Sequence, residues 1–143
     1  MFIKQVSVFV ENESGKLSEC LDILGENKID IRALSIADTK DFGILRLIVD
    51  KPNEAKDLLK AKNYVVKVND VVAIRISNEP GGLMKALHIL KDSNIQIEYL
   101  YAFVGDSKES ASVMLKVSDN EKTIELLKNN NIEFIEAEEI QTI

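Results

Sequence analysis

The chain has 143 residues, of which 45 % are hydrophobic and 29 % charged, a balance typical of soluble globular proteins and not of disordered or fibrous ones. Its 24 acidic and 18 basic residues give a net charge of −6, which disfavours nucleic acid or an anionic membrane as a principal partner, because binding either requires concentrated basic charge. One cysteine and one histidine exclude an internal disulfide and a zinc site built by this chain alone, and the absence of a long apolar run predicts a cytoplasmic protein with no membrane contact.

The first half of the chain is expected to alternate strands and helices. Valines at every second position predict a strand over residues 3–10, and a polar loop follows it. Apolar side chains at Leu17, Cys20, Leu21 and Leu24 then have the i, i+3, i+4, i+7 spacing of a helix. The remaining expected elements of this half are strands 29–37 and 42–50, a helix that begins at Pro52, and strand 64–68.

The second half repeats the first. A shift of 66 positions places Asn12 on Asn78, Gly15 on Gly81, and the pair Ile29 and Ile31 on Ile95 and Ile97. Beyond the middle of each copy the shift becomes 68, which a two-residue loop insertion explains. We therefore predict two domains, residues 1–69 and 70–143, with a turn at Asn69–Asp70. The expected elements of the second are strand 71–77, helix 83–93, strands 95–104 and 111–117, helix 120–130 and strand 132–138.

Each copy reads strand, helix, strand, strand, helix, strand. This order predicts an α+β protein of two ferredoxin-like βαββαβ units, each an antiparallel sheet with its helices on one face. The second strand of such a unit lies at a sheet edge, and residues 33–37 and 99–104 are apolar on nearly every position. Because an uncovered apolar edge promotes aggregation, we expect a homodimer that covers it; the alternative is a monomer in which the chain's other copy does so.

The turn between the first strand and first helix of each copy is the candidate ligand site. Glycine there permits a positive φ, and the free N–H groups at the start of the helix can seat a carboxylate. Asn and Glu side chains can hold an ammonium group, so the turn suits a free amino acid. The alternative is an ordinary turn in which Asn caps the helix. The candidate ligand-binding residues are Asn12, Glu13, Ser14, Gly15, Lys16 and Leu17 in the first copy and Asn78, Glu79, Pro80, Gly81, Gly82 and Leu83 in the second.

The two turns and the isoleucine pairs that follow them resemble the ACT domain. The family pattern runs (D/N)-x-P-G-x-L and then I-x-I, and the second copy matches it at Asn78, Pro80, Gly81, Leu83, Ile95 and Ile97. The first copy matches it at Asn12, Gly15, Leu17, Ile29 and Ile31, with Ser14 in place of the proline.

The resemblance implies a regulatory or sensory module that binds amino acids at interfaces between paired domains. The ligand would touch the glycine turn of one domain and the second strand of its neighbour, which adds Asp30, Ile31, Gln96 and Ile97 to the candidate ligand-binding residues. Serine-binding members of the family carry Asn between the two isoleucines, where this chain has Asp30 and Gln96. The choice between serine and an amino acid with an amide or apolar side chain stays open.

The remaining polar residues form no catalytic pattern. The sequence contains no P-loop, no G-x-S-x-G and no H-E-x-x-H, so we expect no enzyme activity, no catalytic residue, no metal and no cofactor. Cys20 lies on the apolar stripe of its helix and is expected in the core, whereas His88 lies on the opposite face of its helix and is expected in solvent.

Two functions remain in competition at this point. The first is a non-catalytic regulatory module that binds a small amino acid at ACT-domain interfaces. The second is a regulatory subunit that docks onto an enzyme of amino-acid metabolism without a ligand of its own; it resembles the small regulatory subunits of amino-acid biosynthetic enzymes, which also carry ACT domains. A degenerate enzyme fragment is a third, weaker interpretation.

Overall fold

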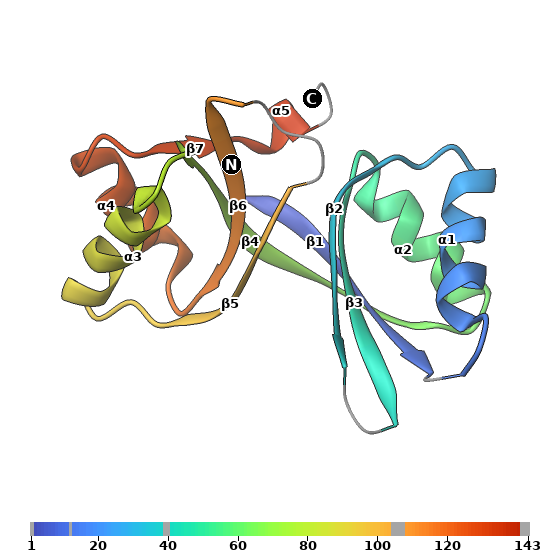
Figure 1. Ribbon diagram of the computed structural model, residues 1–143. Coiled ribbons are helices and arrows are strands. Elements are labelled where there is room, and N and C mark those ends of the chain that lie inside the picture. Colours follow the sequence, from blue (N-terminus) through green and yellow to red (C-terminus); the bar gives the residue numbers. More distant parts are fainter. Residues whose placement is uncertain (1, 12, 39–40, 104–107, 141–143) are drawn as a thin grey trace. The chain divides into compact units, whose positions relative to one another are not determined.

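The computed structural model describes residues 2–11, 13–38, 41–103 and 108–140, and these form two compact units (Figure 1). We call the unit built around Lys4–Asn69 the N-terminal unit and the one built around Asp70–Glu139 the C-terminal unit. Along the described stretches, no helix is long and apolar enough to cross a membrane.

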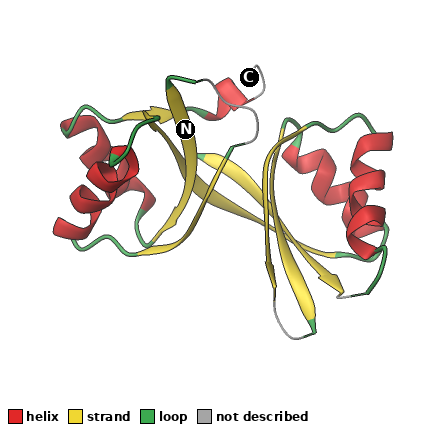
Figure 2. Ribbon diagram, viewed as in Figure 1, coloured by secondary structure: helices red, strands yellow, loops and turns green. Residues whose placement is uncertain are grey.

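The N-terminal unit is a four-stranded sheet with two helices on one face (Figure 2). The sheet order is β2-β3-β1-β4, with β3 antiparallel to both of its neighbours. The second strand is therefore at an edge, as expected. The elements are β1 (Ile3–Glu11), α1 (Lys16–Glu26), β2 (Ile31–Asp38), β3 (Phe42–Val49), α2 (Pro52–Ala61) and the start of β4 (Val65–Ser77).

The C-terminal unit repeats this arrangement. The end of β4 pairs with β6 on one side and β7 on the other, and β5 lies at the edge beyond β6. The predicted fold class, two ferredoxin-like units with antiparallel sheets, is confirmed. The elements after β4 are α3 (Gly82–Asp92), β5 (Ile97–Ala102), β6 (Ser110–Val117), α4 (Asn120–Asn129), β7 (Glu133–Ile135) and α5 (Ala137–Ile140).

Two predicted element boundaries are wrong. The turn expected at Asn69–Asp70 does not form, because β4 runs without interruption from Val65 to Ser77. Asn69 does not fold back on its own backbone as a turn asparagine would; its side-chain oxygen accepts a hydrogen bond from Ser7 Oγ at 3.4 Å, across from β1. The last strand is shorter than predicted and is followed by α5, where the Glu139 carboxylate accepts a hydrogen bond from the N–H of Glu136 at 3.2 Å.

The helices of the two copies end with the same backbone conformation. Each of the four long helices is followed by a residue with positive φ, namely Lys28, Asn63, Asn94 and Asn131. After α1, Ile29 N–H donates to Leu24 O at 3.0 Å, and after α3, Ile95 N–H donates to Leu90 O at 2.9 Å. This six-residue bond is the mark of a Schellman ending, which satisfies carbonyl groups that the helix leaves free.

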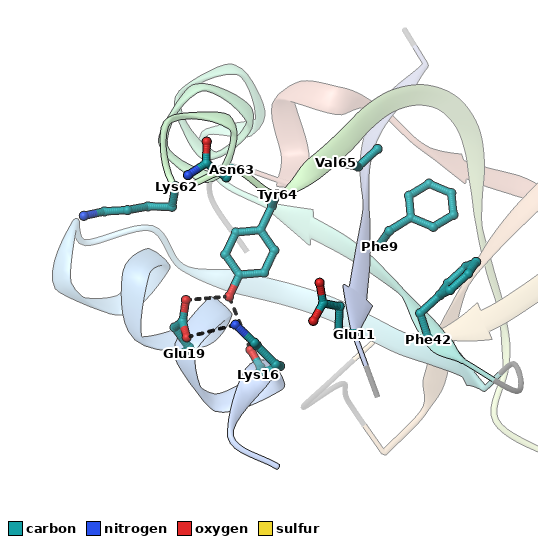
Figure 3. Close-up of a pocket in the computed structure, with 9 residues that line it drawn as sticks. All are labelled: Phe9, Glu11, Lys16, Glu19, Phe42, Lys62, Asn63, Tyr64 and Val65. Atoms are coloured by element: carbon teal, nitrogen blue, oxygen red, sulfur yellow. Dashed lines mark hydrogen bonds and ion pairs between the residues drawn. The ribbon is translucent and has the colours of Figure 1, made fainter. Parts of the chain in front are cut away.

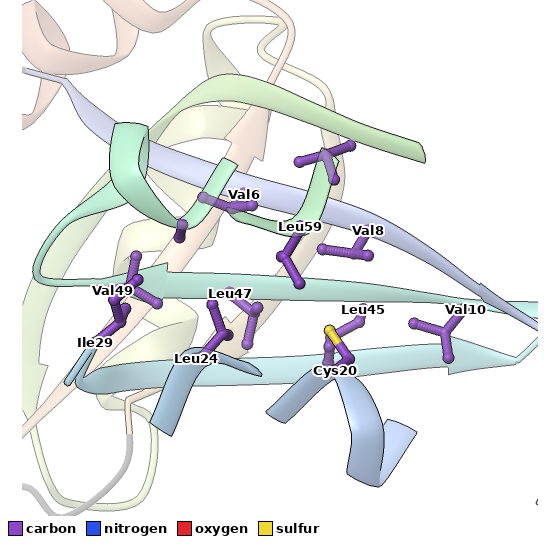
Figure 4. Close-up of a cluster of buried hydrophobic side chains, with 12 residues drawn as sticks. Val6, Val8, Val10, Cys20, Leu24, Ile29, Leu45, Leu47, Val49 and Leu59 are labelled. Atoms are coloured by element: carbon purple, nitrogen blue, oxygen red, sulfur yellow. The ribbon is translucent and has the colours of Figure 1, made fainter. Parts of the chain in front are cut away.

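Each unit has its own hydrophobic core between sheet and helices. In the N-terminal unit the valines of β1 pack against Cys20 and Leu24 of α1 (Figure 4), so the prediction that Cys20 is a core residue is confirmed. In the C-terminal unit Leu90 of α3, the counterpart of Leu24, is fully buried against residues of β4 and β6. His88 is exposed, also as predicted.

Candidate functional site

Both glycine turns have the backbone conformation expected of them. Gly15 (φ 86°) and Gly81 (φ 85°) are left-handed and occupy the N-cap positions of α1 and α3, where no side chain caps the helix. The interpretation of the asparagine as a helix cap is therefore wrong at Asn78. Its Nδ2 donates to the carbonyl of Lys108 at 3.2 Å and its backbone N–H to Glu109 O at 3.0 Å. Asn12 lies outside the described residues.

Each turn presents two backbone donors at the start of its helix. In the C-terminal unit Gly82 N–H donates to Glu79 O at 3.1 Å, and the first intrahelical bond joins Lys85 N–H to Gly81 O at 3.3 Å. The N–H groups of Leu83 and Met84 lie between these two and have no acceptor in the described chain. In the N-terminal unit Leu17 and Ser18 hold the corresponding positions, because Lys16 N–H donates to Glu13 O and Glu19 N–H to Gly15 O.

The other turn residues differ in exposure. Gly82 is buried because its backbone runs against β4, where an added Cβ would overlap the carbonyl oxygen of Ser77. The Glu79 carboxylate accepts a hydrogen bond from Ser77 Oγ at 3.0 Å. The remaining candidates lie on the surface or are half-buried: Glu13, Ser14, Gly15, Leu17, Glu79, Pro80 and Gly81 are exposed, and Lys16 and Leu83 are half-buried.

The second-strand candidates lie at the far end of the first helix within their own unit. Asp30 precedes β2, where its carboxylate pairs with Arg32 at 3.2 Å, and Ile31 begins that strand. Gln96 donates its backbone N–H to Ser118 Oγ at 3.1 Å, and Ile97 begins β5. Because eleven helical residues rise about 16 Å, neither turn reaches the isoleucine pair of its own unit directly.

A groove of about 550 Å³ does join two of the candidates in the C-terminal unit. It runs beside α3 and has Leu83 near the turn and Ile97 at the start of β5. Its lining is mostly apolar, and Met84 within it is 56 % exposed. His88 and Lys91 supply its polar groups.

A cavity of about 610 Å³ in the N-terminal unit was missed by the sequence analysis, apart from Lys16 (Figure 3). It lies where β1 ends, α1 begins and β4 begins. We call it the N-terminal cavity. Its lining residues are Phe9, Glu11, Lys16, Glu19, Phe42, Lys62, Asn63, Tyr64 and Val65.

Tyr64 ties this cavity to the first turn of α1. Its hydroxyl donates to Glu19 Oε1 at 3.1 Å and lies 3.5 Å from the carbonyl of Lys16, while Lys16 Nζ lies 4.0 Å from Glu19 Oε2. Loss of hydration and the hydrogen bond to Glu19 raise the pKa of Tyr64 to about 12, so its phenol keeps its proton in alkaline solution as well as at neutral pH.

Cys20, the residue after Glu19 in α1, also has a raised pKa. Burial, followed by the nearby Glu19 carboxylate, raises the pKa of its thiol from 9.0 to about 11. A raised folded-state pKa contributes stability that is fully present below the unfolded pKa and lost as pH rises through the folded one. We therefore expect the N-terminal unit to lose about 2–3 kcal/mol between pH 9 and pH 11 through this thiol.

Urea unfolding measured at pH 7.5, 9 and 10.5 checks this expectation. The matched variant is Cys20→Ala, since alanine stands at the equivalent position Ala86. We expect its free energy of unfolding to fall less steeply above pH 9 than that of the parent chain. Equal slopes for the two proteins would show that the thiol does not carry the pH dependence.

Two solved structures resemble the chain over 90 % or more of its length. A crystal structure of a Bacteroides thetaiotaomicron protein is 38 % identical in sequence, with a TM-score of 0.94, and the match covers 100 % of this chain and 98 % of that one. The ligand-free regulatory subunit of aspartate kinase from Thermus thermophilus shares the fold at 15 % identity, with a TM-score of 0.68 and coverage of 90 % and 93 %.

A curated relative and a family model complete the comparison. The acetolactate synthase small subunit of Buchnera aphidicola subsp. Baizongia pistaciae is 21 % identical over 94 residues, which cover 66 % of this chain and 59 % of that protein. The model of the ACT domain pair matches residues 1–143. The chain therefore belongs to the ACT domain pair family.

Proposed function

We propose that this ACT domain pair is a non-catalytic, cytoplasmic regulatory module that binds a small amino acid at its glycine turns. The observation that carries the proposal is the pair of unpartnered N–H groups on Leu83 and Met84, directly after the left-handed Gly81. Two aligned donors at the positive end of a helix favour a carboxylate by about 0.3–1 kcal/mol at a surface site, more when a neighbouring chain excludes water.

The other groups of an amino acid would find partners near the same turn. The Glu79 carboxylate, already oriented by Ser77, is available to an ammonium group. In the N-terminal unit the corresponding donors are the N–H groups of Leu17 and Ser18, with Lys16 half-buried beside them. We include both turns in the proposal.

A second copy of the chain would complete the site. The edge strands β2 and β5 carry exposed apolar side chains, since Leu34 is 37 %, Ile36 52 % and Leu100 39 % exposed. An equivalent strand from another copy would cover them and would bring Asp30–Ile31 or Gln96–Ile97 of that copy toward a glycine turn. We therefore propose a homodimer, with domains at residues 1–69 and 70–143.

A thermal-shift screen of the full chain against the twenty amino acids, with size-exclusion chromatography alongside, tests this function. A ligand at 100 times its Kd should stabilise the protein by about 2.7 kcal/mol, which corresponds to a rise of several degrees in Tm. We expect Gly81→Val to abolish that rise, because a β-branched residue is strained at φ 85° and shifts the two donors. Gly25→Ala, in the last turn of α1, is the control and should leave the rise unchanged. If the Gly81→Val protein folds and shows the same rise in Tm as the parent chain, the amino acid does not bind at this turn.

The relatives favour a second candidate function. One is the regulatory subunit of aspartate kinase and another the small subunit of acetolactate synthase, so this chain could instead dock onto an enzyme of amino-acid metabolism without its own ligand. No thermal shift with any amino acid, together with co-purification of such an enzyme, would favour that function over the first.

A further inference from the structure

The duplication places a second cavity, of about 360 Å³, at the matching position in the C-terminal unit. The two cavities use equivalent residues: Phe9 corresponds to Arg75 and Glu11 to Ser77 at the shift of 66, and Phe42 to Ser110 at the shift of 68. Their backbones match, but their side chains have different chemistry. The difference indicates what each cavity can bind.

The N-terminal cavity has an aromatic wall. Phe9 and Phe42 meet edge to face, with ring centroids 5.5 Å apart and ring planes at 64°. Phe42 is 39 % exposed and Val65 beside the cavity is 60 % exposed, so apolar surface remains open to a ligand. Such a wall suits an apolar or aromatic body of the size that a cavity of 610 Å³ admits.

The charged groups beside this wall favour a cation. Glu11 lies between Tyr64 and Phe9 (Figure 3), and its carboxylate takes part in no ion pair within the part of the chain that the structure describes. Glu19 adds a second carboxylate, which Lys16 balances at 4.0 Å, whereas Lys62 points away from the other lining residues (Figure 3). The four charged lining residues sum to zero, but Lys16 pairs with Glu19 and the Lys62 side chain points away, so the Glu11 carboxylate is left beside the aromatic rings, a combination that attracts an ammonium group.

The counterpart in the C-terminal unit lacks both features. Arg75 stands where Phe9 does and pairs with the carboxylates of Glu133 and Glu139, the latter at 3.6 Å. Serines replace the second phenylalanine and the carboxylate, at Ser110 and Ser77. The guanidinium takes the place of the first phenylalanine, and the Glu133 carboxylate is paired with it, so the lining of this cavity provides neither an aromatic ring nor a carboxylate without a cation.

We propose that the N-terminal cavity is a binding site for a primary amine carried on an apolar or aromatic body, and that its C-terminal counterpart does not bind this class. The ammonium group is held by Glu11, and the body lies against Phe9 and Phe42. This site lies beside the N-terminal glycine turn and shares Lys16 with it, but it requires an amine, whereas the turns require a carboxylate.

Isothermal titration calorimetry of the full chain distinguishes these requirements. The probes are phenethylamine and 3-phenylpropionate, which has a similar body with a carboxylate in place of the amine. We expect phenethylamine to bind with one site per chain and 3-phenylpropionate not to bind at this cavity. No binding of phenethylamine, or 3-phenylpropionate that displaces phenethylamine with equal affinity, would overturn the proposal.

Variants locate the binding. Glu11→Gln, at an exposed position, should weaken phenethylamine binding by about tenfold or more, because it removes the charge-assisted hydrogen bond. Asp22→Asn removes the same charge from an exposed position of α1 outside the cavity and should have little effect. Phe42→Ser copies the residue of the C-terminal counterpart and should weaken binding as well, which gives a second test should Glu11→Gln fail to fold.

One further variant separates this proposal from the function proposed above. Gly81→Val should leave phenethylamine binding unchanged. Unchanged phenethylamine affinity in both Glu11→Gln and Phe42→Ser would refute the cavity site while leaving amino-acid binding at the turns intact. Loss of amino-acid binding in Gly81→Val alone would support the turns and say nothing against the cavity.

Discussion

Replacing Gly82 with alanine is expected to destabilise the C-terminal unit by about 3 kcal/mol or more, although it adds a single methyl group. That methyl would overlap the carbonyl oxygen of Ser77 and lie 3.2 Å from its Oγ. Ser77 cannot easily retreat, because it belongs to β4 and pairs in register with Ser110 of β6. The clash is therefore between two backbone segments, which a rotamer change cannot relieve.

Urea unfolding of Gly82→Ala measures this loss, with Gly25→Ala as the matched control. Gly25 lies in α1, where an added Cβ would meet nothing within 4 Å. Since alanine is the better helix former and Gly25 lies in the last turn of α1, the control should leave the free energy of unfolding unchanged or slightly raised. Two variants of equal stability would mean that the helix start does not approach β4 as closely as described.

A second large effect is expected where the cores are filled by equivalent leucines. Leu24→Ala should cost the N-terminal unit, and Leu90→Ala the C-terminal unit, about 2–5 kcal/mol each. Both side chains are fully buried, and each lies between a helix and the central strands of its own sheet. The truncation loses apolar burial and leaves a cavity that close-packed neighbours fill only in part.

Hydrogen exchange, read separately for each unit, is the suitable measurement. Protection should fall mainly in the unit that carries the substitution. Leu17→Ala is the control on the same helix, because Leu17 is 37 % exposed and its loss should cost well under half as much. Equal losses for Leu17→Ala and Leu24→Ala would contradict the packing described for α1.

The fold could be predicted from short-range patterns because its elements are regular and occur twice. The alternating valines at Val6, Val8 and Val10 and the helical spacing that ends at Leu24 specify which face of each element is buried. The recurrence of both patterns after 66 residues then identified the second unit. The need for glycine at Gly15 and Gly81 was also predictable, because both turns place a left-handed residue directly before a helix.

The parts that escaped prediction depend on contacts between distant segments. Asn69 has the composition of a turn, yet its bond to Ser7, 62 residues away, accompanies an uninterrupted strand. The N-terminal cavity likewise joins Phe9, Phe42 and Tyr64, which no local pattern connects. The one signal present in the sequence was the comparison of the two copies with each other, in which Phe9 and Glu11 align with Arg75 and Ser77.

The residues that determine the path of the backbone in each copy are different from those that line its cavity. Lys28, Asn63, Asn94 and Asn131, together with the two turn glycines, recur at matching positions and determine where the chain changes direction. The side chains that line the two cavities recur in position but not in kind. The path of the backbone and the chemistry of the cavities therefore depend on different residues. After a duplication, substitutions in the lining of one copy's cavity can change its chemistry without changing the backbone conformation of that copy.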